Sequence, residues 1–380
     1  MLRLTIFFLL IWIGHAKESV LSSQELVDLI LANEPDKLAA LDDYSLLSDL
    51  FDYYQIQHHS RRPMLKSDLE KDMRMENFKE TLKFIIKTNS DEENTFKLSL
   101  NEFSDWTQAE LRHHTGLIPD NSEHSISRLD TNPVPDAENF YPLNNRSDDS
   151  WDWTEHGIIS PVKNQGQCGG CYAFAFVGVL ESNYAIRHKI LVNMSEQEFI
   201  DCTATFGCKG GNFIPCYNYV KTKNWRTQRA THYPYMAVNG QCQLHQSMPV
   251  HIGEKLYKRA PTNDEVALKT LLRKHGPMFI AFNVGNQKSA SSLQIDISKI
   301  FNSYSSGIFD VPGCNERPLQ NHAMLLVGYG HDKKTGLDYW KVKNSWSTRW
   351  GENGFIRIRR GVNMGGIATN AYYIGSLSSS

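Results

Sequence analysis

The cysteines of this chain are gathered in its second part. The sequence has 380 residues and seven cysteines, and all seven follow residue 167. Residues 17–167 must therefore fold without a disulfide, whereas the rest of the chain can be cross-linked. An odd number leaves at least one cysteine free even if the others pair. The distribution predicts two differently built parts and one available thiol.

The N-terminus has the pattern of a secretory signal. Arg3 precedes an almost uninterrupted apolar run over residues 4–13, and Gly14 and Ala16 form a small-x-small cleavage pattern. The run is too short for a bilayer, which takes about 20 apolar residues. A buried N-terminal helix is the alternative interpretation. We predict that residues 1–16 are a cleaved signal and that the protein reaches the extracellular space or a lysosome.

Two further observations fit the secretory route and exclude other classes. Asn145 and Asn193 each begin a glycosylation sequon. The net charge is -2, with no basic stripe, so no nucleic-acid partner is expected. No later segment is apolar enough to span a membrane. With 41% hydrophobic residues the chain can bury large cores.

Residues 17–118 have helical patterns. The stretch LSSQELVDLILA combines serine caps with apolar residues at helical spacing. A second, longer pattern predicts a helix over 66–89, with one stripe in which Glu70 pairs with Arg74 one turn later. The stripe consists of Glu70, Arg74, Phe78, Thr81, Ile85 and Asn89. Residues 119–150 are rich in Pro, Asn, Asp and Ser, which predicts an exposed connector open to proteolysis.

The second part of the chain begins with a helical pattern and continues with strands. Ser195 and Glu198 form a capping-box motif that predicts the start of a helix. Residues 324–330 and 338–346 flank a turn-rich stretch, as in a hairpin. Residues 354–361 alternate isoleucine with arginine, as in a half-buried strand. We expect an α+β fold or two subdomains.

The sequence QGQCGGCYAFAF at 165–176 has two cysteines with only glycine between them. A redox dithiol is expected near a βαβ pattern in a chain with little other cysteine, and neither condition holds. A zinc ribbon needs a second CxxC, and Cys202 and Cys208 are six positions apart. A nucleophile fits better, because Cys171 opens an apolar helix whose N-terminal N–H groups and dipole favour a thiolate.

A nucleophilic cysteine also needs a base that a third group orients. His322 precedes the apolar run of 324–330, and Asn344 ends the return strand of the predicted hairpin. An amide there accepts a proton from the imidazole and fixes its tautomer. Gln165 lies just before the helix and can donate its amide, beside the Cys171 N–H, to a developing oxyanion. Each residue alone has an ordinary structural interpretation, but the four together favour catalysis.

Several blocks resemble the signature motifs of papain-like cysteine proteases, close to the cathepsin L type. They are VKNQGQCGGCYAFAF, SEQEFIDC, GCKGG, NHAMLLVGYG and KNSWSTRWGENGFIRIRRG, and they cover about 150–380. The stripe of 70–89 and SLNEFSD at 99–105 resemble the family's inhibitory propeptide, over about 50–107. The implied fold is a helical lobe and a β-barrel lobe preceded by a helical propeptide, with Cys171 and His322 on opposite walls of a cleft.

The resemblance implies a role for each site residue. Cys171 is the nucleophile, His322 the general base and acid, Asn344 its orienter and Gln165 the oxyanion donor; peptide bonds are cleaved through a thioester. Trp346 shields the Asn–His hydrogen bond. The substrate-binding residues that the resemblance implies are Gly210, Gly211, Phe213, Ala281, Ala323, Asn370 and Trp346, with an apolar preference. No cofactor or metal is expected.

The family's disulfide pattern implies Cys168–Cys208 and Cys202–Cys242. The third usual bridge would join Cys314 to a cysteine at about position 365, which is Gly365 here. Cys314 and the additional Cys216 are therefore unassigned: free, or paired with each other.

The implied protein is a zymogen with three parts. These are a signal at 1–16, a propeptide at 17–149 with inhibitor helices at about 50–107 and a linker at 119–149, and a mature peptidase at 150–380. We expect removal of the propeptide near 149–151, aided by low pH acting on its carboxylates. The expected partners are peptide or protein substrates, the protein's own propeptide and cystatin-type inhibitors, for a monomer with no membrane span.

Two departures from the family pattern leave other functions open. Gly170 stands where the family has serine, and Tyr172 follows the nucleophile where the family has tryptophan. A pseudoprotease that only binds is therefore one alternative, and a thiol–disulfide oxidoreductase using Cys168 and Cys171 is another. Cys208 and Cys242 are only 34 positions apart, which leaves no room for the loop of a carboxydipeptidase. An endopeptidase is the preferred prediction.

Overall fold

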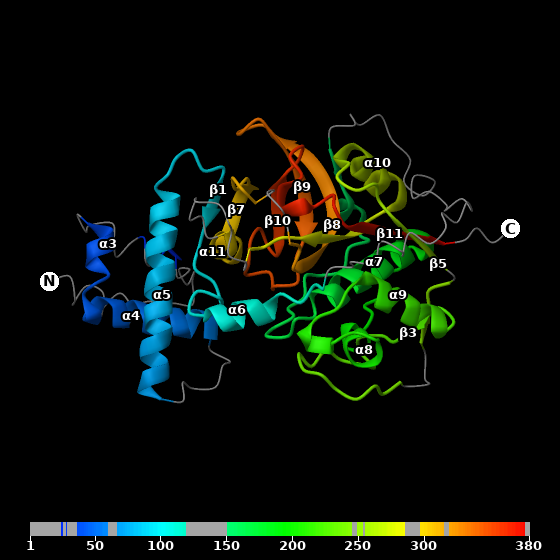
Figure 1. Cartoon of the computed structure of the whole chain (residues 1–380), viewed down its shortest axis with the longest axis horizontal. Helices are drawn as coiled ribbons and strands as arrows, with labels where there is room; N and C mark the ends of the chain where they lie inside the picture. The colour runs from blue at the N-terminus through cyan, green and yellow to red at the C-terminus, as the bar shows by residue number, and fades with distance from the viewer. Residues whose placement is uncertain are drawn as a thin grey trace. The chain divides into compact units, whose positions relative to one another are not determined.

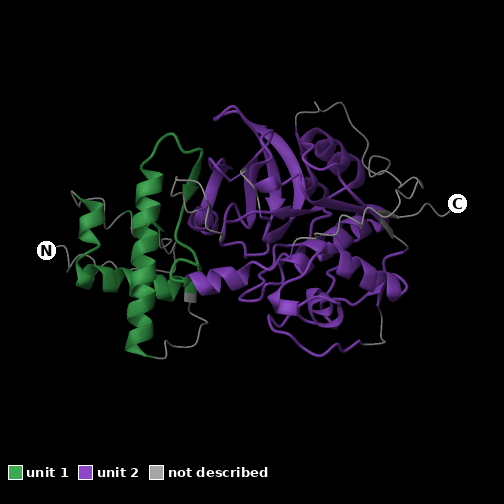
Figure 2. Cartoon of the chain, viewed as in Figure 1, with its two compact units in different colours: residues 1–107 green, residues 108–380 purple. Residues whose placement is uncertain are grey.

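The computed structural model describes residues 24–25, 28, 36–59, 67–118, 150–244, 249–253, 255–285, 297–314 and 319–376. It divides into two compact units, Met1–Thr107 and Gln108–Ser380 (Figure 2). The predicted signal, Asn145 and the connector from 119 to 149 lie outside the described residues. Among the residues that are described, no helix is both long and apolar enough to cross a bilayer.

The first unit is built on helices. Its elements are α3 (Lys37–Ala40), α4 (Tyr44–His59), α5 (Asp68–Asn89) and β1 (Phe96–Leu98). The predicted long helix is confirmed by α5, whose N-cap Ser67 accepts a hydrogen bond from the Glu70 N–H. Phe78 is fully buried, and its ring lies 5.5 Å from that of Phe51 and 4.9 Å from that of Tyr54. These aromatic contacts join α4 to α5.

Three polar members of the predicted stripe, Glu70, Arg74 and Asn89, have partners inside this unit. Arg74 contacts Glu70 at 3.4 Å and lies 3.8 Å from the buried Asp105 carboxylate. The Asn89 amide both donates to the Leu98 carbonyl and accepts from the Leu98 N–H. Burial of these groups is tolerated because each is hydrogen-bonded.

The second unit contains the remaining helices. They are α6 (Gln108–His114), α7 (Cys171–His188), α8 (Glu196–Cys202), α9 (Phe213–Thr222), α10 (Glu265–His275) and α11 (Ile297–Ser303). The unit also contains the 3-10 turns η3 (Trp153–His156), η4 (Gly207–Lys209) and η5 (Met364–Gly366). Helix α7 is buried along most of its length, because small and apolar residues surround it, and it contacts β6, β8 and β11. Figure 1 shows α7, α8 and α9 gathered beside the sheet of the same unit.

The strands of the second unit form a mainly antiparallel sheet. They are β2 (Trp151–Asp152), β5 (Lys255–Arg259), β6 (Met278–Phe282), β7 (Tyr304–Phe309), β8 (His322–Asp332), β9 (Leu337–Lys343), β10 (Phe355–Arg359) and β11 (Ala371–Ser376). The order is β7-β10-β9-β8-β6-β11-β5, and β2 pairs with β8. A separate pair consists of β3 (Arg226–Thr227) and β4 (Val250–His251). The predicted hairpin is β8–β9, and β10 is the predicted half-buried strand, so the α+β prediction is confirmed.

The capping-box prediction is only half right. Ser195 is the N-cap of α8 and accepts from the Glu198 N–H at 3.0 Å. The Glu198 carboxylate does not return to the cap. It is buried and accepts instead from Tyr219, Thr227 and the Gln228 N–H, at 2.7–2.9 Å. Donors on α9 and β3, far away in the sequence, therefore bind the Glu198 carboxylate that the local motif assigned to the helix cap.

Four cysteines form the bridges Cys168–Cys208 and Cys202–Cys242. Cys171, Cys216 and Cys314 are free and buried. The place that a bridging partner of Cys314 would take is occupied, because a Cβ on Gly365 would lie 2.3 Å from Cε2 of Phe282. A phenyl ring therefore fills the space of the absent third bridge.

We expect Gly365→Cys to destabilise the protein rather than to cross-link Cys314. Gly365 has a φ of +58°, so a side chain there meets both backbone strain and the Phe282 ring. The expected loss is about 1–3 kcal/mol, whereas a formed bridge would add about 2–4 kcal/mol. Thermal unfolding and thiol counting of the full-length variant measure both quantities.

Gly336→Ala is the matched control for that substitution. Gly336 has a φ of +71°, with no atom within 4 Å of its Cβ position, so its cost reports backbone strain alone. A higher melting temperature for Gly365→Cys, together with loss of one free thiol, would contradict the expectation.

Candidate active site

The Cys171 thiol lies at the first residue of α7, as the sequence predicts. The side chain is fully buried, and burial raises the pKa of the thiol to about 11, although the backbone N–H groups of Ala323 and Gly116 act in the opposite direction. In this state the sulfur keeps its proton at neutral pH. The helix N-terminus alone predicted a thiolate; the reason for the difference is that residue 116 and its neighbours cover the site.

His322 begins β8 and is fully buried. Its Nε2 lies 2.8 Å from Oδ1 of Asn344, and because an amide oxygen only accepts, Nε2 carries the proton. Its Nδ1 has no hydrogen-bond partner among the described residues. Burial lowers the pKa of His322 to about 4, against the opposing effect of the Asn344 bond. The Trp346 ring, also fully buried, lies 4.8 Å from the imidazole and excludes water from this pair.

Gln165 is buried, and its amide group is held from both ends. Its Oε1 accepts from the Ser345 hydroxyl at 2.6 Å, so the Nε2 group points in a fixed direction. Nε2 donates to two carbonyls, those of Cys168 and His114, each at 2.8 Å. The donor expected for an oxyanion is thus occupied by the carbonyl of His114, a residue that no sequence motif connected with the site.

Residues 114–118, called the cover segment below, run between the two walls of the site. The N–H of Gly211 donates to the Gly116 carbonyl, and the N–H of Ile118 donates to the Gly211 carbonyl, both at 2.9 Å. On the sheet side, the Leu117 N–H donates to the Asn321 carbonyl at 3.0 Å. The cover segment therefore binds by backbone hydrogen bonds to the helical wall and to the sheet wall.

The glycines on both sides allow this close approach. A Cβ on Gly116 would lie 1.8 Å from the Gly169 carbonyl oxygen, and one on Gly210 would lie 2.6 Å from the Gly116 oxygen. Gly210 also has a φ of +122°, which residues with a side chain rarely adopt. A side chain at either of these two positions, Gly116 or Gly210, would push the two backbones apart.

An apolar pocket lies beside Leu117, which is 8% exposed. It is lined by Leu117, Ile118, Asn212, Phe213, Phe279, Ala281, Asn370 and Tyr372. The implied residues Phe213, Ala281 and Asn370 are brought together there, but Ala323 is not among the lining residues and instead faces the Cys171 sulfur. Phe279 and Tyr372 were missed. Their signal was the period of two: Phe279 lies two residues before Ala281 on β6, and Tyr372 lies two residues after Asn370, on the paired strand β11.

Tyr172 and Gly170, the two departures beside the nucleophile, are both accommodated. The Tyr172 hydroxyl lies 2.8 Å from the Thr205 hydroxyl and 3.2 Å from the Gly207 carbonyl. Gly170 has an ordinary φ of -89°, and a Cβ there would lie 3.2 Å from Cδ1 of Ile200. The tyrosine fills the tryptophan position with a hydrogen-bonded ring, and the isoleucine takes the room of the absent serine side chain.

A disulfide excludes the dithiol alternative at this site. Cys168 is bonded to Cys208, so the pair 168 and 171 is not a dithiol. Among the described residues, no group of three or more His, Cys, Asp or Glu side chains is placed to hold a metal ion.

Comparison with known proteins identifies the class. Residues 147–374 match the papain family of cysteine proteases, and residues 51–111 match the cathepsin propeptide inhibitor domain (I29). The chain belongs to the papain family of cysteine proteases and carries a cathepsin propeptide inhibitor domain.

Individual relatives extend over most of the chain. It is 35% identical to fruit bromelain of Ananas comosus, over 78% of this chain and 77% of that protein. It is 31% identical to cathepsin L of Sarcophaga peregrina, over 88% and 94% of the two chains. A recombinant stem bromelain precursor superposes with a TM-score of 0.68 at 31% identity, over 88% of this chain and 100% of that one. Digestive procathepsin L 3 of the Tenebrio molitor larval midgut gives 0.69 at 28% identity, over 87% and 99%.

Proposed function

We propose that this protease is an endopeptidase that works through Cys171, His322 and Asn344. The observation that carries the proposal is the 2.8 Å bond from His322 Nε2 to Asn344 Oδ1, which leaves Nδ1 as the basic nitrogen. The Cys171 sulfur faces the backbone of Ala323, the residue after this base. A cysteine, an oriented imidazole and an amide orienter are the groups that acyl transfer needs.

The proposed reaction has two half-steps. His322 Nδ1 takes the thiol proton while Sγ of Cys171 attacks the peptide carbonyl, and the oxyanion receives hydrogen bonds from Gln165 Nε2 and the Cys171 N–H. The imidazolium then gives its proton to the leaving amine, which leaves a thioester. Water, deprotonated by the same imidazole, hydrolyses the thioester and regenerates the thiol. Peptide turnover by acid-processed protein, with uptake of one equivalent of a thiol-reactive epoxide, tests this function.

The cover segment supports inhibition of the site in the full-length chain. It places a carbonyl on Gln165 and backbone groups on Gly211, the positions that a substrate peptide needs. It also buries the site, so that Cys171 and His322 are both neutral at pH values between about 4 and about 11. Without the cover, the thiol proton can move to the imidazole and activate the sulfur.

The same features support the proposed division of the chain. We assign residues 1–16 to a signal, 17–149 to the propeptide and 150–380 to the mature peptidase. Trp151 and Asp152 form β2, which pairs with β8 in the peptidase sheet, and this supports a cut before them. N-terminal sequencing of the active form tests this boundary.

The pocket beside Leu117 supports a preference for an apolar substrate residue. Leu117 of the cover segment lies against it, and Phe213, Phe279 and Tyr372 form its apolar walls. We propose leucine-like side chains at that substrate position, with Asn370 at the pocket's polar edge.

The further proposals are action outside the cell or in a lysosome, inhibition by cystatin-type proteins, a monomeric state and a glycan on Asn193, which is exposed.

The pH dependence of the latent state follows from His114. Its ring is fully buried against Trp346, with the centroids 4.5 Å apart, and Nδ1 donates to the Gly166 carbonyl at 2.7 Å. Burial, together with the nearby His322, lowers the pKa of His114 from its ordinary 6.5 to about 3. Below pH 6.5 the His114 imidazole binds a proton when the cover segment is released but not when the segment is docked. Docking therefore weakens as the pH falls from 6.5 toward 3, by at most about tenfold per pH unit.

We expect His114→Gln to slow acid activation about tenfold at pH 5. Glutamine keeps an N–H donor for the Gly166 carbonyl but takes up no proton, so acid no longer weakens docking through this residue. The rate at which activity appears between pH 4 and 7 measures the effect. His113→Gln is the matched control, because His113 is exposed on the same helix. Equal activation profiles for the two variants would contradict the role of His114.

A further inference from the structure

The hydroxyl of Tyr172 begins a chain of hydrogen bonds with a single possible direction. Thr203 donates to the Phe199 carbonyl at 2.5 Å, which uses its only proton. Thr203 must therefore accept from Thr205, 2.9 Å away, and Thr205 in turn accepts from Tyr172 at 2.8 Å. The Gly207 carbonyl is a second acceptor for the tyrosine proton at 3.2 Å. The first side chain after the nucleophile thus fixes the loop between the two disulfides.

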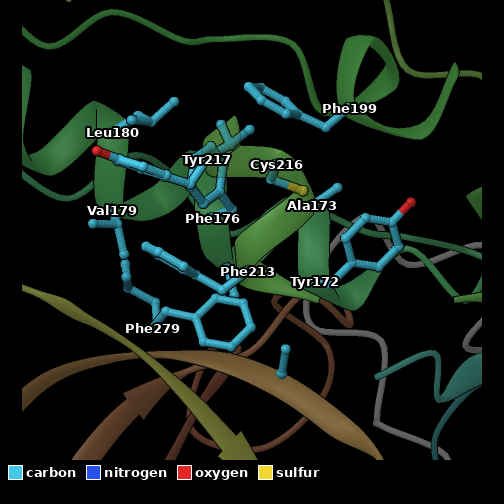
Figure 3. Packing of buried hydrophobic residues seen from close by; sticks show 14 of the residues in the cluster. Tyr172, Ala173, Phe176, Val179, Leu180, Phe199, Phe213, Cys216, Tyr217 and Phe279 are labelled. Atoms are coloured by element: carbon cyan, nitrogen blue, oxygen red, sulfur yellow. The ribbon is translucent and has the colours of Figure 1, made fainter. Parts of the chain in front are cut away.

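The same two side chains lie directly under the backbone edge that binds the cover segment. A Cβ on Gly211 would be 2.8 Å from the Tyr172 ring and 2.8 Å from the Thr205 methyl group, so Gly211 rests against both. Gly211 is the residue whose N–H and carbonyl bond to Gly116 and Ile118. Figure 3 shows Tyr172 beside the apolar cluster, with its hydroxyl pointing away from Phe213 and Phe176.

We propose that Tyr172 is a positioning residue for peptide binding, which sets the place of the Gly211 edge relative to the nucleophile's helix. The inference rests on the proposed function, in which a substrate backbone takes the place of the cover segment at Gly211. The ring supports the edge from below, and the hydroxyl chain holds the loop that leads into it. Preorganising a backbone edge lowers the ordering cost of binding and leaves the bond-making step unchanged.

The test compares Tyr172→Phe with wild type in the acid-processed enzyme. We expect KM for a peptide long enough to reach Gly211 to rise about 3- to 10-fold, the effect of one net hydrogen bond, with kcat unchanged within about twofold. An ester of a single amino acid, which does not reach Gly211, should be hydrolysed equally by both. Thr205→Val should reproduce the effect, and the double variant should add little, because both changes break one chain.

A second measurement does not depend on turnover. In the full-length protein, amide hydrogen exchange over residues 205–211 should be about 3- to 10-fold faster in Tyr172→Phe than in wild type. Tyr219→Phe is the matched control: it removes another hydroxyl of this unit, one that donates to Glu198 at 2.9 Å. It should change neither the exchange of these amides nor the ratio of KM values between long and short substrates.

The outcomes separate the two proposals. A wild-type enzyme without turnover would refute the proposed function, while the exchange measurement would still decide the role of Tyr172. Unchanged exchange over 205–211 would overturn the inference, and so would an equal loss of kcat on the long and the short substrate, which would place the effect at Cys171 instead.

Discussion

Cys171→Ala is expected to abolish peptide hydrolysis, lowering kcat/KM by at least about 10⁴-fold. The reason is that the proposed reaction forms a covalent thioester on this sulfur, and no neighbouring group replaces it. The other two free thiols are buried, and burial raises the pKa of Cys314 to about 12 and that of Cys216 still further. Steady-state hydrolysis of a peptide substrate by acid-processed protein measures the loss.

The matched control for this variant is Cys216→Ala. Cys216 is a fully buried free thiol on α9, in the core cluster that also contains residues of α7. Its replacement should cost about 1 kcal/mol of stability or somewhat more but leave kcat/KM near the wild-type value. Epoxide uptake should disappear in Cys171→Ala and remain at one equivalent in Cys216→Ala. Substantial turnover by Cys171→Ala would place the nucleophile elsewhere in the chain.

The second large effect is expected from Gly116→Ala in the cover segment. The new Cβ would lie 1.8 Å from the Gly169 oxygen, 2.4 Å from the Gly169 carbon and 2.6 Å from its Cα. All three atoms are backbone, next to the loop that Cys168 ties to Cys208, so they cannot move aside as a flexible side chain would. The cover segment must rise from the site, and its docking should weaken by at least about 100-fold, or about 2.7 kcal/mol.

The measurement is the rate at which an epoxide labels Cys171 in the uncleaved chain at pH 7. Labelling should become at least about 100-fold faster in Gly116→Ala, while gel analysis verifies that the chain remains full length. Thr115→Ala is the control, because it changes the adjacent residue, whose hydroxyl bonds to the Arg112 carbonyl within α6 and its C-terminal turn. A labelling rate that stays at the wild-type value in Gly116→Ala would show that the cover segment does not control access.

The elements that follow a local residue pattern could be predicted from the sequence. The stripe of α5, the hairpin β8–β9 and the alternation of β10 follow from periods of 3.6 and 2.0, which neighbouring residues record directly. The bond between His322 and Asn344 joins the two strands at the open end of that hairpin, so the same local pattern brings the two residues close together.

The side chains whose contacts depend on residues far away in the sequence could not be predicted. Glu198 serves donors from α9 and β3 rather than its own helix, and no motif encodes that choice. Phe279 enters the pocket because β6 pairs with β11 in one particular register. His114 carries no signal of its own, since its burial depends on residues about 50 and 230 positions away, Gly166 and Trp346. Each of these three placements depends on contacts with distant parts of the chain. In a paired strand, a register shift of one residue would move the side chain to the other face of the sheet.

The hydrogen bonds of Gly211 carry a consequence for how this protein can change over evolutionary time. The Gly211 edge now bonds to Gly116 and Ile118, and the apolar pocket lies against Leu117; in the proposed enzyme both receive the substrate afterwards. A mutation that reshapes either feature changes both the substrate selectivity and the inhibition by the cover segment. A change of substrate specificity therefore requires compensating substitutions in residues 114–118 if self-inhibition is to be kept. The cover segment and the substrate preference should evolve together.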